Sequence, residues 1–330
     1  MTPRALIIGV GSIGHRHLRC FSLTDRVRLS VCEIDRQLKE EMAKQYPLET
    51  TFDSLEEALQ DPPEIAVICT PAHLHIPMAH QLADLGVHLL IEKPLSTSLE
   101  DVDSLIEKVA QKQLTAAVAY VSRLNPLLAA LRQAIHSGEY GEPMQLTLVS
   151  GQDFPFYRPT YRDIYYNDRA TGGGAIQDAL THAINVGQWL CGDIQGLVAD
   201  ADHQVLNGVE VEDTVHVIAR HGKTMASYSL NQFQAPTEST LTVACTKGTL
   251  RCQSHEQRLS VMTAPEQPWQ VLLETSLERD ELFVAQANMF LDAVAGQGPV
   301  RCTLAEGRET LRANLAILQS VDQGFDRFAY

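Results

Sequence analysis

Two short motifs in this chain carry residue types that can do chemistry. The run Gly9-Val-Gly-Ser-Ile-Gly14 follows an apolar segment near the start, and Glu92-Lys93-Pro94 follows another apolar segment about eighty residues later. Glycines let a backbone turn tightly and approach a phosphate. A lysine can shuttle a proton or hydrogen-bond a substrate oxygen, and a following proline restricts its backbone. The pair predicts a phosphate-containing cofactor beside a group that acts on a substrate.

The context of the glycine run indicates a dinucleotide. It follows an expected strand, opens an expected helix, and precedes by about 20 residues an acidic residue, Glu33, at the end of the next strand. A carboxylate there can accept hydrogen bonds from the adenosine ribose and would repel a 2′-phosphate, which favours NAD; Arg36 keeps NADP open. A tight turn that binds no dinucleotide is the alternative. The residues expected to hold the cofactor on these grounds are Gly9, Gly11, Ser12, Ile13, Gly14 and Glu33.

The end of the third expected strand lies at the same sheet edge as the glycine run. Thr70-Pro71 closes that strand and is expected to shape the cofactor groove. His73 and His75 follow, and each of them taken alone fits a structural role better than a chemical one.

A carboxylate and an imidazole lie four residues apart further along the chain. Asp178 and His182 follow Gly172-Gly-Gly174 on an expected helix, so they share one face. A carboxylate beside a histidine stabilises the imidazolium and orients the ring, as a general base requires. Asn185, one turn further, can reach the same pocket. A structural contact or two metal ligands are the alternatives, but no third and fourth ligand follow at suitable spacing, so no metal is expected.

The first 120 residues alternate short apolar runs with helical patterns, which is typical of a parallel sheet covered on both faces. The expected strands are Arg4–Val10, Arg28–Glu33, Glu64–Thr70, Val87–Lys93 and Thr115–Val121. The expected helices are Ile13–Leu23, Asp35–Tyr46, Ser54–Gln60, Ile76–Leu85 and Leu99–Lys112.

The pattern changes after about residue 121. A helix from Pro126, an alternating run, a loop rich in Tyr, Arg, Asp and Pro (Asp153–Arg169) and a helix to about Leu190 precede five or six strand-like segments up to about Met262. Two helical patterns close the chain. We therefore expect an α/β chain: a doubly wound Rossmann domain over residues 1–121, and an α+β domain with a large, mainly antiparallel open sheet over 122–330. Whether the final helix packs back on the first domain is left open.

Composition limits the partners. The net charge of −15 argues against broad nucleic-acid binding, which needs a basic face. No apolar run approaches the roughly 18 residues of a membrane-spanning helix. The seven cysteines show no C-x-x-C spacing, so free thiols in a reducing, cytoplasmic compartment are expected.

These residues together resemble the glucose–fructose oxidoreductase / inositol dehydrogenase (GFO/IDH/MocA) family, nearly from end to end. The resemblance rests on the order and spacing of several short motifs, each loose when taken alone. They are the glycine run with His17, Thr70-Pro71 with His75, Glu92-Lys93-Pro94, Tyr120 with Arg123 and Pro126, the three glycines with Asp178 and His182, Glu212-Asp213-Thr214, and Lys247-Gly248-Thr249-Leu250.

The resemblance implies a dehydrogenase that oxidises or reduces a secondary alcohol or carbonyl of a sugar, inositol or related polyol with NAD, or with NADP. By analogy His182 takes the hydroxyl proton, Lys93 hydrogen-bonds the same oxygen, and Asp178 tunes His182. The Lys93–Pro94 peptide is often cis in relatives. The resemblance also implies that the cofactor pocket includes Thr70, Pro71, His75, Glu92 and Lys93.

The same resemblance implies a small-molecule substrate and a homodimer or homotetramer, because the open sheet often serves oligomerisation in relatives. Ala183 stands where some relatives acting on sugar acids carry an acidic residue, so the substrate is not assigned. A catalytically silent dinucleotide sensor, or an enzyme that recycles tightly held NAD, are the alternatives. Substrate contacts are expected from Tyr120, Arg123, Tyr157, Arg158, Tyr161, Arg162 and Asn185, with aromatic rings for sugar stacking and arginines for an acidic group.

Overall fold

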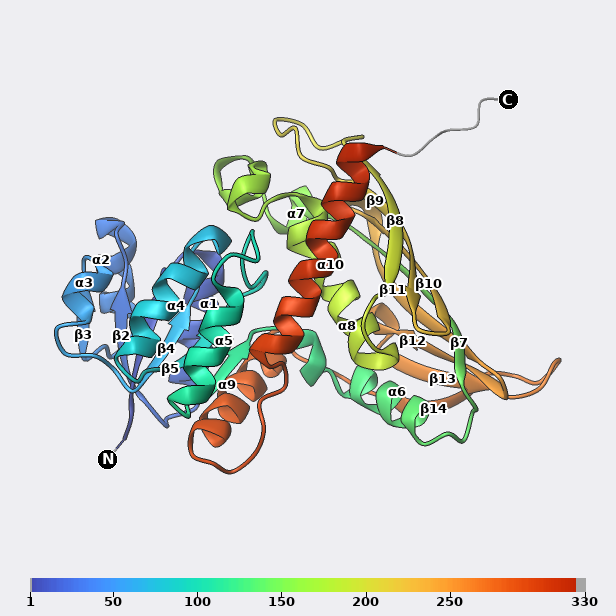
Figure 1. The fold of residues 1–330 in the computed structure, drawn as a ribbon, viewed down its shortest axis with the longest axis horizontal. Coiled ribbons are helices and arrows are strands. Elements are labelled where there is room, and N and C mark those ends of the chain that lie inside the picture. The colour runs from blue at the N-terminus through green and yellow to red at the C-terminus, as the bar shows by residue number, and fades with distance from the viewer. Residues whose placement is uncertain (1, 325–330) are drawn as a thin grey trace. The chain divides into compact units, whose positions relative to one another are not determined.

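The computed structural model describes residues 2–324 and divides into two compact units (Figure 1). Unit 1 consists of Met1–Leu124 and Glu278–Arg308, and unit 2 of Asn125–Leu277 and Glu309–Tyr330. Residues 325–330, the end of the expected second domain, lie outside the described residues. Each unit is described by itself below.

Unit 1 is built on a six-stranded parallel sheet in the order β3-β2-β1-β4-β5-β6. This doubly wound order places the carboxyl ends of β1 and β4 side by side, at the edge where such sheets bind ligands. The central strands read as continuous apolar runs because both faces of the sheet are covered. The strands are β1 (Arg4–Ile8), β2 (Arg28–Cys32), β3 (Thr50–Phe52), β4 (Ile65–Ile68), β5 (His88–Ile91) and β6 (Ala116–Val118).

Capping residues help to set where the helices of unit 1 begin. Asp35, for example, caps α2 by accepting hydrogen bonds from the backbone N–H groups of Gln37 and Leu38. The helices are α1 (Ser12–Ser22), α2 (Arg36–Gln45), α3 (Leu55–Ala58), α4 (His75–Asp84), α5 (Val102–Gln111) and α9 (Glu281–Val294).

Unit 2 contains an eight-stranded sheet in the order β14-β13-β12-β11-β7-β10-β9-β8, in which β7 and β10 are parallel and the other pairs antiparallel. The mainly antiparallel open sheet that we expected is confirmed. Its strands are β7 (Pro143–Asp153), β8 (Gly196–Asp202), β9 (Thr214–His221), β10 (Thr224–Asn231), β11 (Phe233–Cys245), β12 (Gly248–Gln253), β13 (Arg258–Met262) and β14 (Gln270–Glu274).

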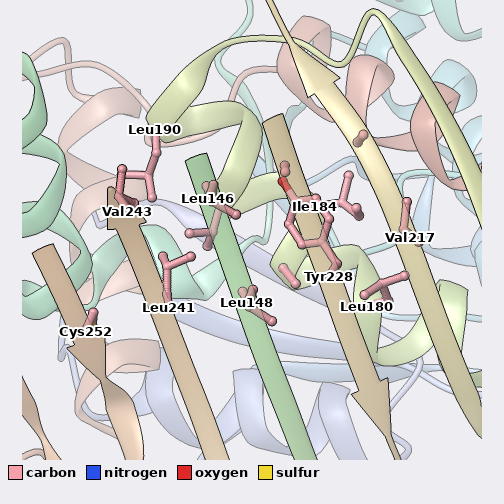
Figure 2. Close-up of a cluster of buried hydrophobic side chains, with 14 of the residues drawn as sticks. Leu146, Leu148, Leu180, Ile184, Leu190, Val217, Tyr228, Leu241, Val243 and Cys252 are labelled. Atoms are coloured by element: carbon pink, nitrogen blue, oxygen red, sulfur yellow. The ribbon is translucent and has the colours of Figure 1, made fainter. Parts of the chain in front are cut away.

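Helices cover one face of this sheet. Leu146 and Leu148 on β7 and Tyr228 on β10 are buried with Ile184 of α8, in the core shown in Figure 2. Alternate residues point to the opposite face, where Ile218 and other apolar side chains are exposed. The helices of this unit are α6 (Pro126–His136), the single turn α7 (Phe154–Tyr157), α8 (Thr181–Cys191) and the larger part of α10 (Leu304–Gln323).

The expected second domain, 122–330, differs from unit 2 in residues 122–124 and in one long segment, which both belong to unit 1. Glu278–Arg308 belongs to unit 1, because Ala287, Phe290 and Leu291 of α9 are buried in one apolar cluster with β1 and β4. The short strands β3 and β14 were also not predicted from the sequence. Both lie at sheet edges, where few apolar residues are needed.

Two further observations concern the described residues as a whole. All seven cysteines are free thiols, as expected. Within residues 2–324, no helix has both the length and the apolar character needed to cross a membrane.

Candidate active site

The glycine run forms a tight turn between β1 and α1. Gly9 has φ +80°, a backbone conformation that favours glycine. A Cβ on Gly14 would lie 1.8 Å from the carbonyl oxygen of Gly9, so only glycine lets the helix pass this close to the turn. A Cβ on Gly11, in contrast, would meet no atom within 4 Å. No side chain caps the amino end of α1 at Gly11, and the amino end of a helix that follows a glycine turn suits a pyrophosphate. The turn fits a dinucleotide.

This difference between two glycines makes a testable prediction. Gly14→Ala should destabilise the protein by about 1–3 kcal/mol, because its Cβ overlaps the backbone of the turn. Gly11→Ala should leave the melting temperature unchanged but weaken NAD binding by about tenfold or more, because its methyl group occupies the space for the pyrophosphate. Thermal unfolding with and without NAD measures both. Full NAD affinity in Gly11→Ala would contradict the assignment of this space.

Glu33 connects the glycine turn to the end of β2. One carboxylate oxygen accepts a hydrogen bond from the N–H of Val10 at 2.7 Å, and the other accepts one from the N–H of Asp35 at 2.9 Å. Each oxygen keeps a second lone pair that can accept a bond from a ribose hydroxyl. The side chain is mostly buried, so it is fixed before any ligand binds.

Thr70 and Pro71 follow β4 at the same sheet edge, Thr70 half-buried and Pro71 exposed. His75 differs from them because its side chain is buried. Its Nε2 lies 2.8 Å from the carbonyl oxygen of Thr70, and its Nδ1 lies 3.1 Å from that of Pro94. Burial lowers the pKa of His75, although the two carbonyls and the charge of Glu92 favour its protonated form. His75 therefore supports the backbone after β4 and β5, the structural role that the residue alone favoured, and, against what the resemblance implied, presents no exposed ring to a cofactor.

Glu92 and His17 form a buried pair directly before Lys93. His17 Nε2 lies 2.7 Å from one carboxylate oxygen of Glu92, and the other oxygen accepts a hydrogen bond from the backbone N–H of Lys93 at 2.9 Å. Burial by itself would raise the pKa of Glu92, but the hydrogen bond from His17 and the charges of His17 and Lys93 hold it below its ordinary value. Glu92 thus holds the backbone of Lys93, and we no longer place it against the cofactor.

The ring of His17 is covered by Phe283 of α9, with 5.5 Å between the ring centroids. Lys93 itself is only partly buried. The peptide bond between Lys93 and Pro94 is cis, as the resemblance implied.

In unit 2, Asp178 lies on a π-helical turn, Ile176–Leu180, and His182 lies in the first turn of α8. Both side chains are half-buried. The hydroxyl group of Tyr165 donates a hydrogen bond to Asp178 Oδ1 at 2.7 Å. Tyr165 lies in the Tyr- and Arg-rich loop from which we expected substrate contacts, but it was not among the residues predicted for the site. Single π-helical turns often occur at functional sites because they shift side chains out of the α-helical register.

The loop residues chosen as substrate contacts separate into two groups. Tyr157 is exposed and its hydroxyl lies 3.0 Å from Thr237 Oγ1, while Arg158 is half-buried. Tyr161 is fully buried in an aromatic and aliphatic cluster and donates a hydrogen bond to the carbonyl of Asn207. Arg162 binds the same carbonyl and stacks on the Tyr161 ring. The structure therefore gives Tyr161 and Arg162 roles in packing the loop.

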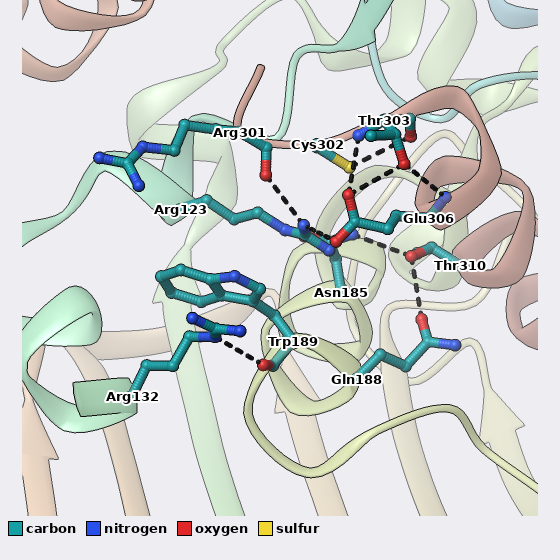
Figure 3. Close-up of polar contacts among 10 residues, drawn as sticks. All are labelled: Arg123, Arg132, Asn185, Gln188, Trp189, Arg301, Cys302, Thr303, Glu306 and Thr310. Carbon is teal, nitrogen blue, oxygen red and sulfur yellow. Dashed lines mark hydrogen bonds and ion pairs between the residues drawn. The ribbon is translucent and has the colours of Figure 1, made fainter. Parts of the chain in front are cut away.

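Three other expected substrate contacts are buried: Tyr120, Arg123 and Asn185. Arg123 donates to the carbonyl oxygen of Arg301 at 2.9 Å and pairs with Glu306 inside unit 1 (Figure 3). In unit 2, the side-chain amide of Asn185 donates to the hydroxyl oxygen of Thr310 at 2.9 Å, which holds α8 to α10. Tyr120 lines a small apolar cavity beside Phe290. We withdraw Arg123 and Asn185 as substrate contacts, because structural partners occupy their polar groups.

No group of three or more His, Cys, Asp or Glu side chains in the described part of the chain is arranged to hold a metal ion.

Comparison with known proteins identifies relatives of both halves of the chain. Residues 4–120 match the model of an oxidoreductase family with an NAD-binding Rossmann fold, and residues 128–251 match the GFO/IDH/MocA C-terminal domain. The chain is 25% identical to levoglucosan dehydrogenase of Pseudarthrobacter phenanthrenivorans over 58% of this chain and 52% of that protein. It is 28% identical to inositol 2-dehydrogenase of Rhizobium meliloti over 58% of this chain and 56% of that protein. The aligned part thus spans about half the length of these two relatives.

The fold itself matches solved structures over nearly the whole chain. A levoglucosan dehydrogenase in complex with NADH superposes with a TM-score of 0.88, covers 98% of both chains and is 21% identical in sequence. At this level of identity the likeness concerns the fold.

Proposed function

This chain belongs to the GFO/IDH/MocA oxidoreductase family, whose N-terminal domain is an NAD-binding Rossmann fold, and we propose that it transfers a hydride between NAD and a secondary alcohol or carbonyl of a sugar, inositol or related polyol. The observation that carries the proposal is the turn between β1 and α1, which only glycine permits at Gly14 and which Glu33 joins to the neighbouring strand. The names of the two sequence relatives support a polyol substrate.

In this proposal the cofactor lies across the glycine turn. The backbone of Gly9, Gly11, Ser12, Ile13 and Gly14 faces the pyrophosphate, Glu33 accepts hydrogen bonds from the ribose, and Thr70 and Pro71 line the groove. When bound, NAD supplies the acceptor for the hydride.

Side chains of the protein transfer the proton of the reacting hydroxyl group and stabilise the charge that develops on its oxygen. The Lys93 ammonium donates a hydrogen bond to the reacting oxygen and stabilises negative charge on it. The imidazole of His182 takes the hydroxyl proton as general base. Asp178 stabilises the imidazolium that forms, and the Tyr165 hydroxyl keeps one oxygen of Asp178 in place. Tyr157 and Arg158 remain the loop residues proposed to contact the substrate.

The partners of the arginines favour an uncharged substrate. Arg123 pairs with Glu306 and donates a hydrogen bond to a backbone carbonyl, and Arg162 donates one to the carbonyl of Asn207. Two of the three arginines expected to bind an acidic group therefore bind other groups of the protein. We therefore propose inositols and neutral sugars in preference to sugar acids.

A substrate screen tests the whole proposal. Purified protein is incubated with inositols, levoglucosan, neutral sugars and sugar acids, with NAD and NADP separately. Formation of the reduced nicotinamide is followed by its absorbance. We expect reduction of NAD with at least one uncharged polyol. If neither an uncharged polyol nor a sugar acid is oxidised with NAD or NADP, the alternative function, a dinucleotide-binding sensor, replaces the proposed enzyme. Cofactor that stays bound through purification would instead indicate recycling of tightly held NAD.

Cofactor preference gives a second test at a single residue. Glu33→Gln removes the charge that repels a 2′-phosphate and weakens the bond to the ribose, so the ratio of kcat/KM for NAD to that for NADP should fall about tenfold. Steady-state kinetics with both cofactors measure the ratio. Glu56→Gln, an exposed carboxylate on α3, is the matched control and should leave the ratio unchanged. An unchanged ratio in Glu33→Gln would show that Glu33 only braces the turn.

The exposed sheet face of unit 2 supports a homo-oligomer. Val149, Ile218 and Met225 lie on neighbouring strands β7, β9 and β10 and are all exposed, on the face opposite the helices. We propose that a second copy covers this face in a homodimer or homotetramer. Sedimentation should show an assembly that Ile218→Lys dissociates; a monomeric wild-type protein would contradict this.

A further inference from the structure

A buried carboxylate that the proposed chemistry does not use lies at the start of the helical segment carrying Asp178 and His182. Glu212 is 2% exposed. One of its carboxylate oxygens accepts a hydrogen bond from the backbone N–H of Ile176 at 3.0 Å, and its carbonyl oxygen accepts one from the N–H of Ala175 at 2.9 Å. The first turn of this segment is therefore bound to Glu212 through both side chain and backbone.

Two glycines before this segment pack closely against neighbouring groups, and one of them meets the same carboxylate. Gly174 has φ +83°, and a Cβ there would lie 2.5 Å from a carboxylate oxygen of Glu212. A Cβ on Gly173 would lie 2.3 Å from the carbonyl oxygen of Tyr166 and 2.6 Å from that of Tyr165. The glycines thus let one short stretch pack closely against both Glu212 and the residue whose hydroxyl binds Asp178.

Arg169 balances the charge of Glu212. Its Nε lies 2.7 Å from the second carboxylate oxygen, and its Nη1 lies 3.0 Å from Asp322 at the end of α10. Gln177, which directly precedes Asp178, donates a hydrogen bond to the carbonyl oxygen of Arg169 at 2.8 Å. A buried carboxylate is costly unless it is paired and hydrogen-bonded. Here Arg169 pairs with the carboxylate and the Ile176 N–H donates a hydrogen bond to it, and a negative charge at the amino end of a helix is also favourable.

We infer that Glu212 is a positioning residue for the proposed active site: its buried carboxylate, paired with Arg169, fixes the helical turn that sets the places of Asp178 and His182. This inference rests on the proposed function for its kinetic consequence, but its structural consequence can be measured without turnover. A general base must lie within hydrogen-bond reach of its proton, and a displacement of about 1 Å can cost 10²-fold in rate.

The test compares three variants of the full chain. Glu212→Ala removes the acceptor for the Ile176 N–H and the partner of Arg169. Glu212→Gln keeps an oxygen for the Ile176 N–H but loses the charge. Glu210→Ala, an exposed carboxylate two residues earlier, is the matched control. Hydrogen exchange followed by mass spectrometry reports on residues 175–182, and kinetics with the best polyol of the screen report on catalysis.

We expect Glu212→Ala to accelerate exchange in residues 175–182 and to lower kcat by about 100-fold, with KM for NAD and for the polyol within about threefold of wild type. Glu212→Gln should recover most of the lost kcat, and Glu210→Ala should match wild type in both measurements. If Glu212→Ala does not fold, Glu212→Gln and Arg169→Met take its place. Both should then accelerate exchange in residues 175–182 and lower kcat, by smaller amounts.

Two results would overturn the inference: wild-type exchange in residues 175–182 after loss of the carboxylate, or a loss of kcat that Glu212→Gln does not recover at all. If the wild-type protein oxidises no polyol, the proposed function fails, and the exchange of residues 175–182 alone still decides whether Glu212 fixes this turn.

Discussion

Replacing Lys93 with methionine is expected to lower kcat by about 10³-fold while the dissociation constant for NAD stays near that of the wild type. Methionine keeps most of the length of the side chain and removes the ammonium that we propose as the donor to the reacting oxygen. Glu92 would still hold the backbone of residue 93, because that hydrogen bond uses the main-chain N–H. Steady-state kinetics and a fluorescence titration with NADH measure the two quantities separately.

The control for this variant is Lys223→Met, which removes an equally charged but exposed side chain on the surface of unit 2 and should leave kcat unchanged. A Lys93→Met protein that retains turnover would show that the ammonium takes no part in the reaction. A loss of NAD binding as large as the loss of kcat would assign Lys93 to the cofactor instead.

His182→Asn is expected to lower kcat/KM for the polyol by about 10²- to 10⁴-fold, the usual contribution of a positioned general base. The wild-type rate should fall at acid pH as the imidazole gains a proton, and this acidic limb should disappear in the variant. A pH–rate profile of both proteins, measured at saturating NAD, tests the assignment.

His216→Asn, which changes an exposed histidine on β9, serves as its control and should keep the wild-type profile. An acidic limb that persists in His182→Asn would place the general base elsewhere. Asp178→Asn should give an intermediate loss, since the imidazole remains but loses the carboxylate that we propose stabilises its protonated form.

Much of the fold could be predicted because its signals are local. Short apolar runs separated by helical patterns fix the parallel sheet of unit 1, since strands covered on both faces need apolar side chains throughout. Alternation of buried and exposed residues along β9 likewise fixes one packed and one open face in unit 2. Edge strands such as β14 were not predicted because they bury little apolar surface, so their apolar residues show only a weak periodicity.

Side-chain partners were harder to predict than elements. Arg123, Arg162 and Asn185 have residue types suited to a polar ligand, yet each is bound within the fold. Tyr165 was overlooked although two tyrosines of the same loop were chosen, of which Tyr157 is exposed and Tyr161 is buried. Residue type indicates what a group can do; only its neighbours show whether that capacity is already used.

The sequence alone determined the glycine turn, the order of the elements and the position of Lys93 after a strand. These depend on the backbone freedom of glycine and on the periodicity of apolar residues, which are properties of neighbours along the chain. The tertiary structure decided the contacts between residues far apart in the chain, such as His17 with Glu92, Tyr165 with Asp178, and Glu212 with the turn before His182. It also assigned Glu278–Arg308 to unit 1. Such contacts depend on which surfaces pack together, and no local pattern encodes that choice.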